Sequence, residues 1–306
     1  MIVGPSIPIT EGMILDSNIS MDGEPPDYDP DAIYDLADRV TYQNYVFESL
    51  QAGNEDNVPP DANSDLFWVR IGAVNRFKPF ESDIRRVRLY DQCTNPDEIT
   101  FDIQPGQRFD MLGFFNLDAF SIQVVMTDPV AGEVYNRTVD LDDRSGIRSF
   151  WDWCFPTFKT QKSKVLFDLP PFLNAAISIT ISKAGGIAAV GQIVVARQIP
   201  LGTAIFGTEV SSRDYSTYDQ DVNGQFSNFL RRPKQSIIDF RAAVSTDEAA
   251  YIQEVFFDSL SDRPAIYAAG EGTEHLGTTV FARGADLRLP LSANITFISI
   301  RAEQFV

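Results

Sequence analysis

The sequence predicts a mainly β protein made of three units. These are a small three-stranded module, a β-sandwich domain, and a C-terminal β-rich domain (α+β or β-sandwich) with one helix. Short apolar runs alternate with polar residues at a period of 2, which is the pattern of strands with one buried face. Aromatic residues make up 12% of the chain, and 19 Gly and 18 Pro are scattered along it. This composition is typical of many short strands separated by turns.

The 306 residues are enough for two or three domains. We expect an extended N-terminal arm over residues 1–27, because no helical or strand period persists there and an acidic, Pro-rich stretch ends it. Such an arm is expected to fold against a neighbouring chain. The small module is predicted over 28–79, the β-sandwich over 80–200, and the C-terminal domain over 201–306.

In the small module, short runs rich in aromatic and β-branched residues predict strands at 39–42, 45–48 and 67–69. Polar turns, among them Gly53-Asn54, separate them. A unit of this size buries little surface. We therefore expect it to lean on the domain that follows.

In the β-sandwich domain, apolar residues alternate with polar ones over 99–103, 120–126 and 177–181. Residues 187–195 are apolar at nearly every position, which predicts one central strand buried on both faces. An aromatic cluster over 150–155 is interpreted as core or inter-domain packing, since large aromatic side chains dominate such contacts.

The C-terminal domain is expected to contain strands at 236–244, 265–268, 278–283 and 294–301, and one helix at about 246–260. Ser245 and Glu248 have the spacing of a capping box at its start. Its predicted buried stripe follows at helical spacing: Ala249, Ile252, Phe256 and Leu260.

The chain is acidic, with 25 Lys and Arg against 43 Asp and Glu and a formal net charge of −18. A field of this sign repels phosphate backbones, so nucleic acid is not an expected partner. The acidity itself is typical of a well-solvated surface. The first residues lack the features of a signal peptide, and the longest apolar stretch, 185–196, is too short to span a bilayer. We expect synthesis in a cytoplasm and no membrane insertion.

Catalytic chemistry finds little support in the sequence. His275 is the single histidine, which removes most acid–base arrangements. Cys93 and Cys154 form neither a disulfide scaffold nor a metal motif. The segment 219–224 resembles the start of a calcium loop, but Leu230 stands where a bidentate Glu is needed. We expect no enzymatic activity, no metal site and no cofactor.

Aromatic residues in the small module form the one group in the sequence that suggests a binding site. Sugar rings dock their apolar faces on exposed aromatic planes. The candidate carbohydrate-binding residues are Tyr28, Tyr34, Tyr45 and Trp68, with Phe47 beside them. The alternative is that these side chains form the core of the module.

The stretch from Ala32-Ile-Tyr34 through Tyr45-Val-Phe47-Glu48 to Trp68-Val-Arg-Ile-Gly72 resembles the small chitin-binding type 3 (family 5/12) carbohydrate-binding module. The resemblance implies a three-stranded fold and a glycan-binding surface. The sequence departs from the family pattern in three places. Tyr28 stands where a tryptophan is usual, Ala37 replaces a turn glycine, and Ser49-Leu50 replaces an exposed aromatic pair.

A second resemblance spans nearly the whole chain and depends on the collinear order of short motifs. The chain is similar to a family of tailed-bacteriophage virion proteins, in which minor tail or tail-tip components occur. The motifs are Ile7-Pro-Ile-Thr10, Ile71-Gly72-Ala-Val-Asn75-Arg76-Phe77, Tyr135-Asn-Arg-Thr-Val-Asp140-Leu141, Trp151-Asp-Trp153, Asp168-Leu-Pro-Pro171, Gly202-Thr-Ala-Ile-Phe-Gly207, Arg213-Asp214-Tyr215-Ser216 and Ala265-Ile266-Tyr267.

This second resemblance implies a structural component of a phage virion, located in the distal tail or baseplate. There it would act as an assembly adaptor in a homo-oligomeric ring and contact other tail or baseplate proteins. Two alternatives remain open: a host-surface glycan-binding (receptor-recognition) protein, and a neck- or head-associated virion protein. A depolymerase or wall hydrolase is the least supported hypothesis.

Overall fold

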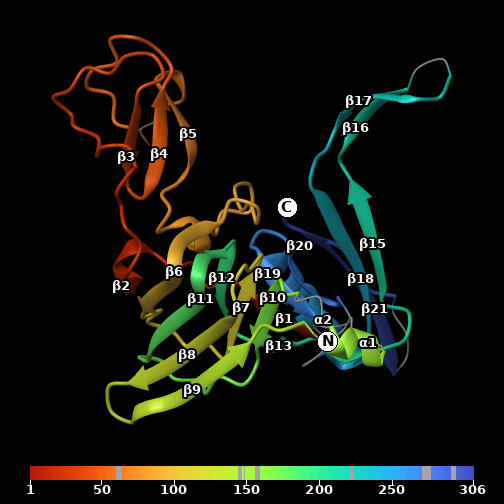
Figure 1. The fold of residues 1–306 in the computed structure, drawn as a ribbon. Helices are drawn as coiled ribbons and strands as arrows, with labels where there is room; N and C mark the ends of the chain where they lie inside the picture. The colour runs from red at the N-terminus through yellow and green to blue at the C-terminus, as the bar shows by residue number, and fades with distance from the viewer. Residues whose placement is uncertain are drawn as a thin grey trace.

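A computed structural model shows a mainly β chain with several antiparallel sheets and one longer helical segment near the C-terminus (Figure 1). The structure describes residues 1–59, 64–143, 147, 149–155, 159–220, 223–270, 277–290 and 294–306. This architecture confirms the predicted mainly β fold.

The small module contains a three-stranded antiparallel sheet, as predicted. Its strands, in sheet order, are β3 (Arg39–Tyr42), β4 (Tyr45–Ser49) and β5 (Trp68–Ala73). A short 3₁₀ turn, η2 (Ser64–Leu66), precedes β5. Ala37, where the resembled family has glycine, has a φ of 71°, a left-handed conformation that non-glycine residues adopt only at some cost.

The central domain has two antiparallel sheets. The larger contains, in order, β2 (Ile14–Ser17), β6 (Cys93–Ile103), β11 (Ala176–Val190), β8 (Ser121–Asp128) and β9 (Gly132–Asp140). The smaller contains β10 (Ser163–Leu166), β7 (Met111–Phe115) and β12 (Gln192–Ala196). Side chains from both, such as Phe101, Ile179 and Phe114, share the largest apolar cluster of the described chain. The sheets therefore pack face to face.

The alternating pattern of this domain is confirmed where it was clearest. Ile177, Ile179 and Ile181 are at most 1% exposed, whereas Ser178 points outward. The prediction of one strand over 187–195 is wrong. β11 ends at Val190, and β12 then continues in the other sheet.

The corner between β11 and β12 lies at Gly191. A Cβ atom there would come within 2.4 Å of the Leu89 carbonyl oxygen. The backbone can therefore turn here only with glycine. A continuous apolar run cannot reveal such a change of sheet, because every residue from 188 to 196 is buried.

The C-terminal domain is built on an eight-stranded sheet, in which β15 (Glu209–Asp214) pairs with β18 beside the main path. The path runs β13 (Ile199–Pro200), β1 (Ile2–Pro5), β19 (Ala265–Ala268), β20 (Thr279–Arg288), β21 (Ile295–Gln304), β18 (Lys234–Ser245) and β14 (Thr203–Ala204). The four strands predicted in this domain correspond to β18, β19, β20 and β21.

The predicted helix is present but irregular. It begins as a 3₁₀ turn, η4 (Thr246–Glu248), continues as α2 (Ala249–Val255), and ends as a π-helical turn, η5 (Phe256–Leu260). Its predicted apolar stripe is buried against the sheet. The capping box is not formed, because Ser245 makes no side-chain capping hydrogen bond.

The opposite face of the C-terminal sheet packs on the small sheet of the sandwich. Ile266 and Phe281 contribute to a shared cluster with Val194 and Phe115, and the Phe115 and Phe281 rings stack with centroids 5.4 Å apart. The layers thus run from helix to C-terminal sheet to the two sheets of the sandwich.

Residues 1–27 do not form the extended arm that we expected. β1 lies inside the C-terminal sheet between β13 and β19, and β2 pairs with β6. A 3₁₀ turn, η1 (Glu11–Met13), precedes β2. Val3 is fully buried and Ile14 nearly so. Their burial and ladder hydrogen bonds hold the segment within this chain, which the Pro-rich composition of its second half did not reveal.

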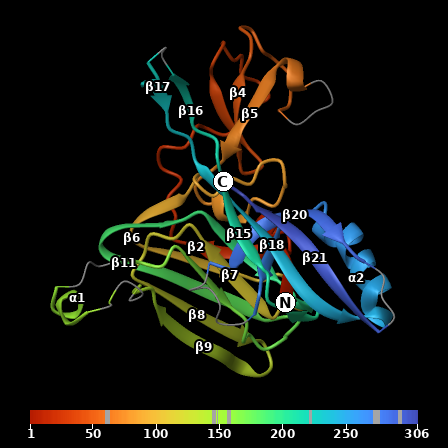
Figure 2. The same ribbon diagram turned by 90° about the vertical axis from the view of Figure 1, so that its right-hand side faces the viewer.

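The aromatic cluster at 150–155 is also placed differently from the prediction. It forms a short helix, α1 (Phe150–Cys154), which lies beyond the sheets (Figure 2). Phe150, Trp151, Trp153 and Phe155 are each between 68% and 73% exposed, and their rings pack on one another. Core packing is therefore the wrong interpretation for these rings.

A two-stranded ribbon extends away from the C-terminal sheet (Figure 1). β15 and the first half of β18 form its base, and β16 (Thr217–Gln220) and β17 (Phe226–Leu230) continue it. Every residue of β15 is exposed. The ribbon and the small module thus both project from the body formed by the other sheets.

Candidate functional site

The predicted carbohydrate-binding aromatics pack against one another inside the small module. The Trp68 ring lies 5.2 Å from Tyr34 and 6.0 Å from Tyr28 in edge-on contacts. Its indole Nε1 donates a hydrogen bond to the carbonyl of Asn57 at 2.7 Å, and only 2% of the residue is exposed. Trp68 therefore presents no free plane to a sugar.

The tyrosine side chains also make contacts within the protein. Tyr28 stacks on Tyr34 with a centroid distance of 5.8 Å, and the Tyr34 hydroxyl donates to the Asp29 carbonyl at 3.1 Å. The Arg70 guanidinium covers the Tyr45 ring, 3.1 Å from its centroid. Burial raises the pKa of Tyr45 to about 12. The structure brings the four candidates together in one cluster, with Trp68 in the core of the module and the three tyrosines half-buried against it.

A cleft of about 500 Å³ lies where the module meets the sandwich. One wall is β5, and the other is the segment 78–91, which includes the 3₁₀ turn η3 (Lys78–Phe80). A smaller hollow of about 290 Å³ shares Trp68, Arg70 and Arg86 with it. Seven charged side chains line the cleft: Asp65, Arg70, Lys78, Glu81, Arg86, Arg88 and Asp91.

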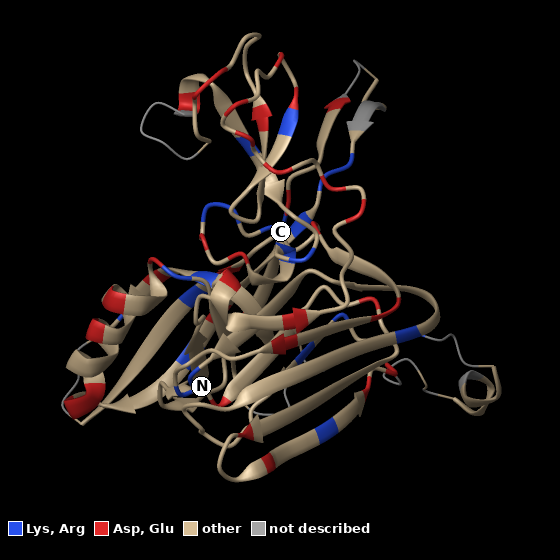
Figure 3. Cartoon of the chain, turned by 90° about the vertical axis from the view of Figure 1, so that its left-hand side faces the viewer, with Lys and Arg blue, Asp and Glu red and all other residues tan. Residues whose placement is uncertain are grey.

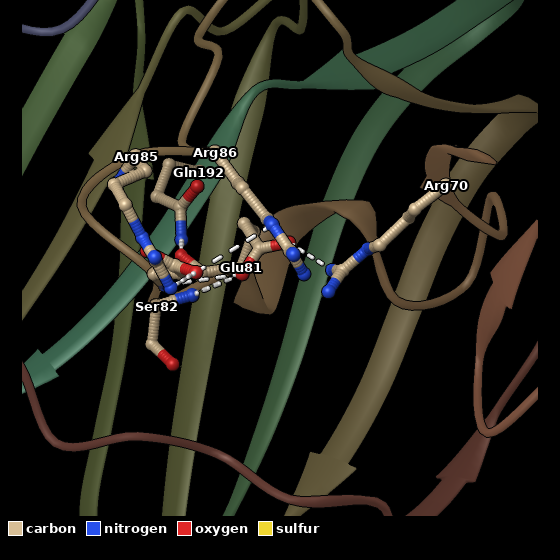
Figure 4. A network of polar contacts seen from close by, with 7 residues as sticks. Arg70, Glu81, Ser82, Arg85, Arg86 and Gln192 are labelled. Carbon is tan, nitrogen blue, oxygen red and sulfur yellow. Dashed lines mark hydrogen bonds and ion pairs between the residues drawn. The ribbon is translucent and has the colours of Figure 1, made fainter. Parts of the chain in front are cut away.

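Arg70 and Glu81 form the central ion pair of this cleft, at 2.7 Å (Figure 4). Only 18% of the Arg70 side chain and 11% of the Glu81 side chain are exposed. The Glu81 carboxylate also accepts hydrogen bonds from the backbone N–H groups of Ser82 and Asp83. Burial raises the pKa of Glu81, and these two N–H donors oppose the rise.

The Glu81 backbone is fixed to the sandwich as well. Its carbonyl accepts a hydrogen bond of 2.8 Å from the buried Gln192 side chain on β12. The pair therefore links a strand of the module to a strand of the sandwich. Partly desolvated pairs of this kind are sensitive to the loss of either partner.

The remaining cations of the cleft differ in how well they are neutralised. Lys78 pairs with Asp91 at 2.8 Å, whereas Asp83 is held by Arg85 at 2.9 Å and lies 3.5 Å from Arg86. Arg88 makes no ion pair with any residue that the structure describes. Basic residues gather where the module meets the sandwich (Figure 3). The cleft is therefore locally cationic on an acidic protein.

Sequence reasoning missed this site because the segment 78–91 has no clear strand or helix period. One signal was available. Arg85-Arg86-Val87-Arg88 is a dense basic stretch in a chain of net charge −18. The ion pair itself joins residues of two units and depends on how those units pack.

Other candidates for chemistry give no site in the described chain. His275 lies outside the described residues, and so do positions 221 and 222 of the calcium-like segment. Within the described ranges, no group of three or more His, Cys, Asp or Glu side chains has the arrangement of metal ligands. The same ranges contain no helix of the length and apolarity needed to cross a membrane.

Comparisons with protein-family models, with curated proteins and with solved structures gave no match for this chain.

Proposed function

We propose that the chain is a structural, non-enzymatic component of a tailed-phage virion, in the distal tail or baseplate, where it acts as an assembly adaptor. The motif order in the sequence supports this proposal, and the projecting ribbon formed by β15–β18 is the structural observation that carries it. The proposal includes no cofactor, no nucleic-acid partner and no membrane insertion.

The ribbon supports an assembly role because an isolated two-stranded ribbon is marginally stable in water. Beyond its base, β16 and β17 pair only with each other among the described strands. Val210, Tyr215, Tyr218 and Leu230 are each between 43% and 55% exposed on it. A neighbouring subunit or tail protein that covers these side chains would complete the element. In a ring of identical copies, each ribbon would lie on the next subunit.

Host-surface glycan recognition is a second candidate, favoured by the projection of the small module from the body (Figure 1). The two roles are compatible, because a tail tip can carry a recognition module. Binding of host envelope glycans by the purified chain would support it. Because Trp68 is buried, Tyr28 and Tyr34 stack on each other, and Arg70 covers Tyr45, the cleft at Arg70 would be the site to mutate first.

Charge insertion on the ribbon tests the assembly role. Val210→Asp is expected to abolish association of the purified chain, measured by sedimentation velocity at micromolar concentration. Val130→Asp is the matched control, because Val130 is 95% exposed in the turn between β8 and β9. A wild-type chain that stays monomeric at micromolar concentration, and does not bind other virion proteins, would contradict the proposal.

Antibody labelling of intact virions tests the location. Label confined to the tail end is the expected result. Label at the neck or on the head would replace the distal-tail proposal with the neck- or head-associated alternative. Absence of the chain from purified virions would overturn the virion proposal as a whole.

A further inference from the structure

The chain covers one outer edge of the three-stranded sheet of the small module and leaves the other edge uncovered. The edge at β3 is covered by residues 26–28: the Tyr28 N–H donates to the Thr41 carbonyl at 2.9 Å, and the Thr41 N–H donates to the Pro26 carbonyl at 2.8 Å. The edge at β5 has no such cover. β5 pairs with β4 alone, and no other backbone group of the described chain bonds to it.

An uncovered strand edge is a row of unpaired N–H and C=O groups that favours the addition of another strand. In this protein the edge does not face open solvent. All six residues of β5, Trp68–Ala73, line the cleft of about 500 Å³. At about 3.3 Å per residue, the strand offers an edge roughly 20 Å long. This length matches an extended peptide of about six residues.

The side chains along this edge also fit an extended occupant. Val69 and Ile71, two positions apart on β5, are 39% and 43% exposed in the cleft. Both side chains line the cleft, although a bulge at Ile71, which has no partner on β4, interrupts the regular alternation of β5. They therefore offer an apolar surface to alternate side chains of an added strand, the basis of specificity in strand addition.

The opposite wall determines the charge of the occupant. Arg86 and Arg88 are exposed there; Arg86 has one long contact of 3.5 Å, to an Asp83 that Arg85 already holds. Arg88 has no acidic partner in the part of the chain that is described. Among the carboxylates that line the cleft, Asp65 is the one without a cationic partner in the described chain, since Glu81 pairs with Arg70 and Asp91 with Lys78. Two weakly neutralised guanidinium groups against one carboxylate favour an anionic occupant.

We propose that the cleft along β5 binds an acidic peptide segment of a partner protein, which adds to the module as a fourth, extended strand. Carboxylates of the peptide pair with Arg86 and Arg88, and its alternate apolar side chains contact Val69 and Ile71. The same chain already shows the principle at its other edge, where residues 26–28 cover β3.

A peptide fits this cleft better than an acidic saccharide does. The unpaired donors and acceptors along the free edge of β5, interrupted by the bulge at Ile71, can pair with another extended backbone. A sugar ring would need an exposed aromatic plane, and the lining offers none. Trp68 is 2% exposed, and the Arg70 guanidinium covers Tyr45 in the adjoining hollow.

Hydrogen exchange of the full chain tests the proposal directly. The probe is the synthetic peptide acetyl-Glu-Val-Glu-Val-Glu-Val-Glu-amide at millimolar concentration. Its binding is expected to slow exchange of amides within residues 68–73, because ladder hydrogen bonds protect them. A second probe, N-methylated at alternate residues, keeps the charge but cannot form the ladder and is expected to give no protection. A lysine analogue of the first probe is expected not to bind.

Charge reversal on the cleft wall provides the second measurement. Arg88→Glu is expected to weaken binding of the acidic probe by about tenfold or more and to allow the lysine analogue to bind. Arg108→Glu is the matched control, since Arg108, in the loop between β6 and β7, is also exposed and free of ion pairs among the described residues. It is expected to leave the affinity of both probes unchanged.

Three results would overturn the proposal. The first is an absence of protection in β5 with the acidic probe. The second is equal binding of the N-methylated probe, which would show attraction by charge without strand addition. The third is binding of polygalacturonate, lost in Arg88→Glu, without any binding of the peptide. That result would identify the cleft as a site for an anionic saccharide.

Discussion

The Arg70–Glu81 pair shows how a single contact can join two units of this fold. Arg70 comes from the edge strand of the module, and Glu81 precedes the sandwich, to which Gln192 anchors its carbonyl. The Arg70 guanidinium also lies over the Tyr45 ring, a cation–π contact. One side chain thus neutralises a partly buried carboxylate and packs the base of the module.

Removing Arg70 is expected to destabilise the protein more than removing both partners. In Arg70→Met the Glu81 carboxylate stays buried without its guanidinium, which is expected to cost about 1–3 kcal/mol. The double variant Arg70→Met/Glu81→Gln leaves no buried charge, so most of that loss is expected to be recovered. Urea unfolding of the wild type, both single variants and the double variant measures the coupling. Additive losses would show that the pair contributes no net coupling.

The raised pKa of Glu81 predicts a dependence of stability on pH. The folded state holds the proton of this carboxyl more tightly than the unfolded state does, whose pKa is near the ordinary 4.5. The resulting stabilisation is complete below 4.5 and is lost as the pH rises through the folded pKa. Relative to Glu81→Gln, the wild type is therefore expected to lose stability as the pH rises from 4.5 towards neutrality.

Urea unfolding across this pH range measures the trend. Glu254→Gln is the matched control, because Glu254 is exposed on α2. The difference in unfolding free energy between Glu254→Gln and the wild type is expected not to show the same dependence on pH. If the wild type and Glu81→Gln change in parallel with pH, ionisation of Glu81 does not affect stability.

In the C-terminal helix, the predicted capping motif at Ser245 can be compared with the buried packing contact of Leu260. The Ser245 spacing predicts a capping box, but the structure shows no side-chain cap at that position. Ser245→Ala is therefore expected to cost less than the roughly 1 kcal/mol of a typical cap. Leu260, fully buried at the far end of the helix, is expected to cost about 2–5 kcal/mol when changed to Ala. Chemical denaturation of both variants checks the order, and equal losses would contradict it.

Strands with one buried face were predictable from period alone. The runs that became β8 and the first half of β11 alternate clearly, because each has one side against a core. The β11–β12 corner was not predictable, since burial on both faces removes the alternation. β1 belongs to a sheet because Val3 pairs with a strand more than 250 residues away, β19. The composition around residue 3 gives no information about that pairing.

The sequence predicts which residues group together at the candidate site, but not which way their side chains face. The sequence identified Tyr28, Tyr34, Tyr45 and Trp68 as one group, and the structure brings them together. Which way the rings face depends on the fold, because a half-buried ring and an exposed platform share the same sequence pattern. The rings of α1, which we had assigned to a core, are exposed instead.

The body of the protein behaves as one packed unit, because its layers share side chains. Gly113 on β7 illustrates how close they come: a Cβ there would lie 2.5 Å from the Ile266 side chain of β19. The module is joined differently. Its own cluster has three buried side chains, Val40, Phe47 and Trp68, and a row of aromatic contacts through Phe77 and Phe80 leads from it to the sandwich core.

These differences predict that the module unfolds before the body. A core of three buried side chains gives a small unit little stability of its own, whereas the layered body is expected to unfold cooperatively. In Trp151→Phe/Trp153→Phe, Trp68 becomes the one tryptophan of the chain and its fluorescence reports on the module alone. Its midpoint in urea is expected below the midpoint from circular dichroism, which is dominated by the body. Adding Phe80→Ala, which interrupts the aromatic row, is expected to widen the gap, and coincident midpoints in both variants would show that module and body unfold as one.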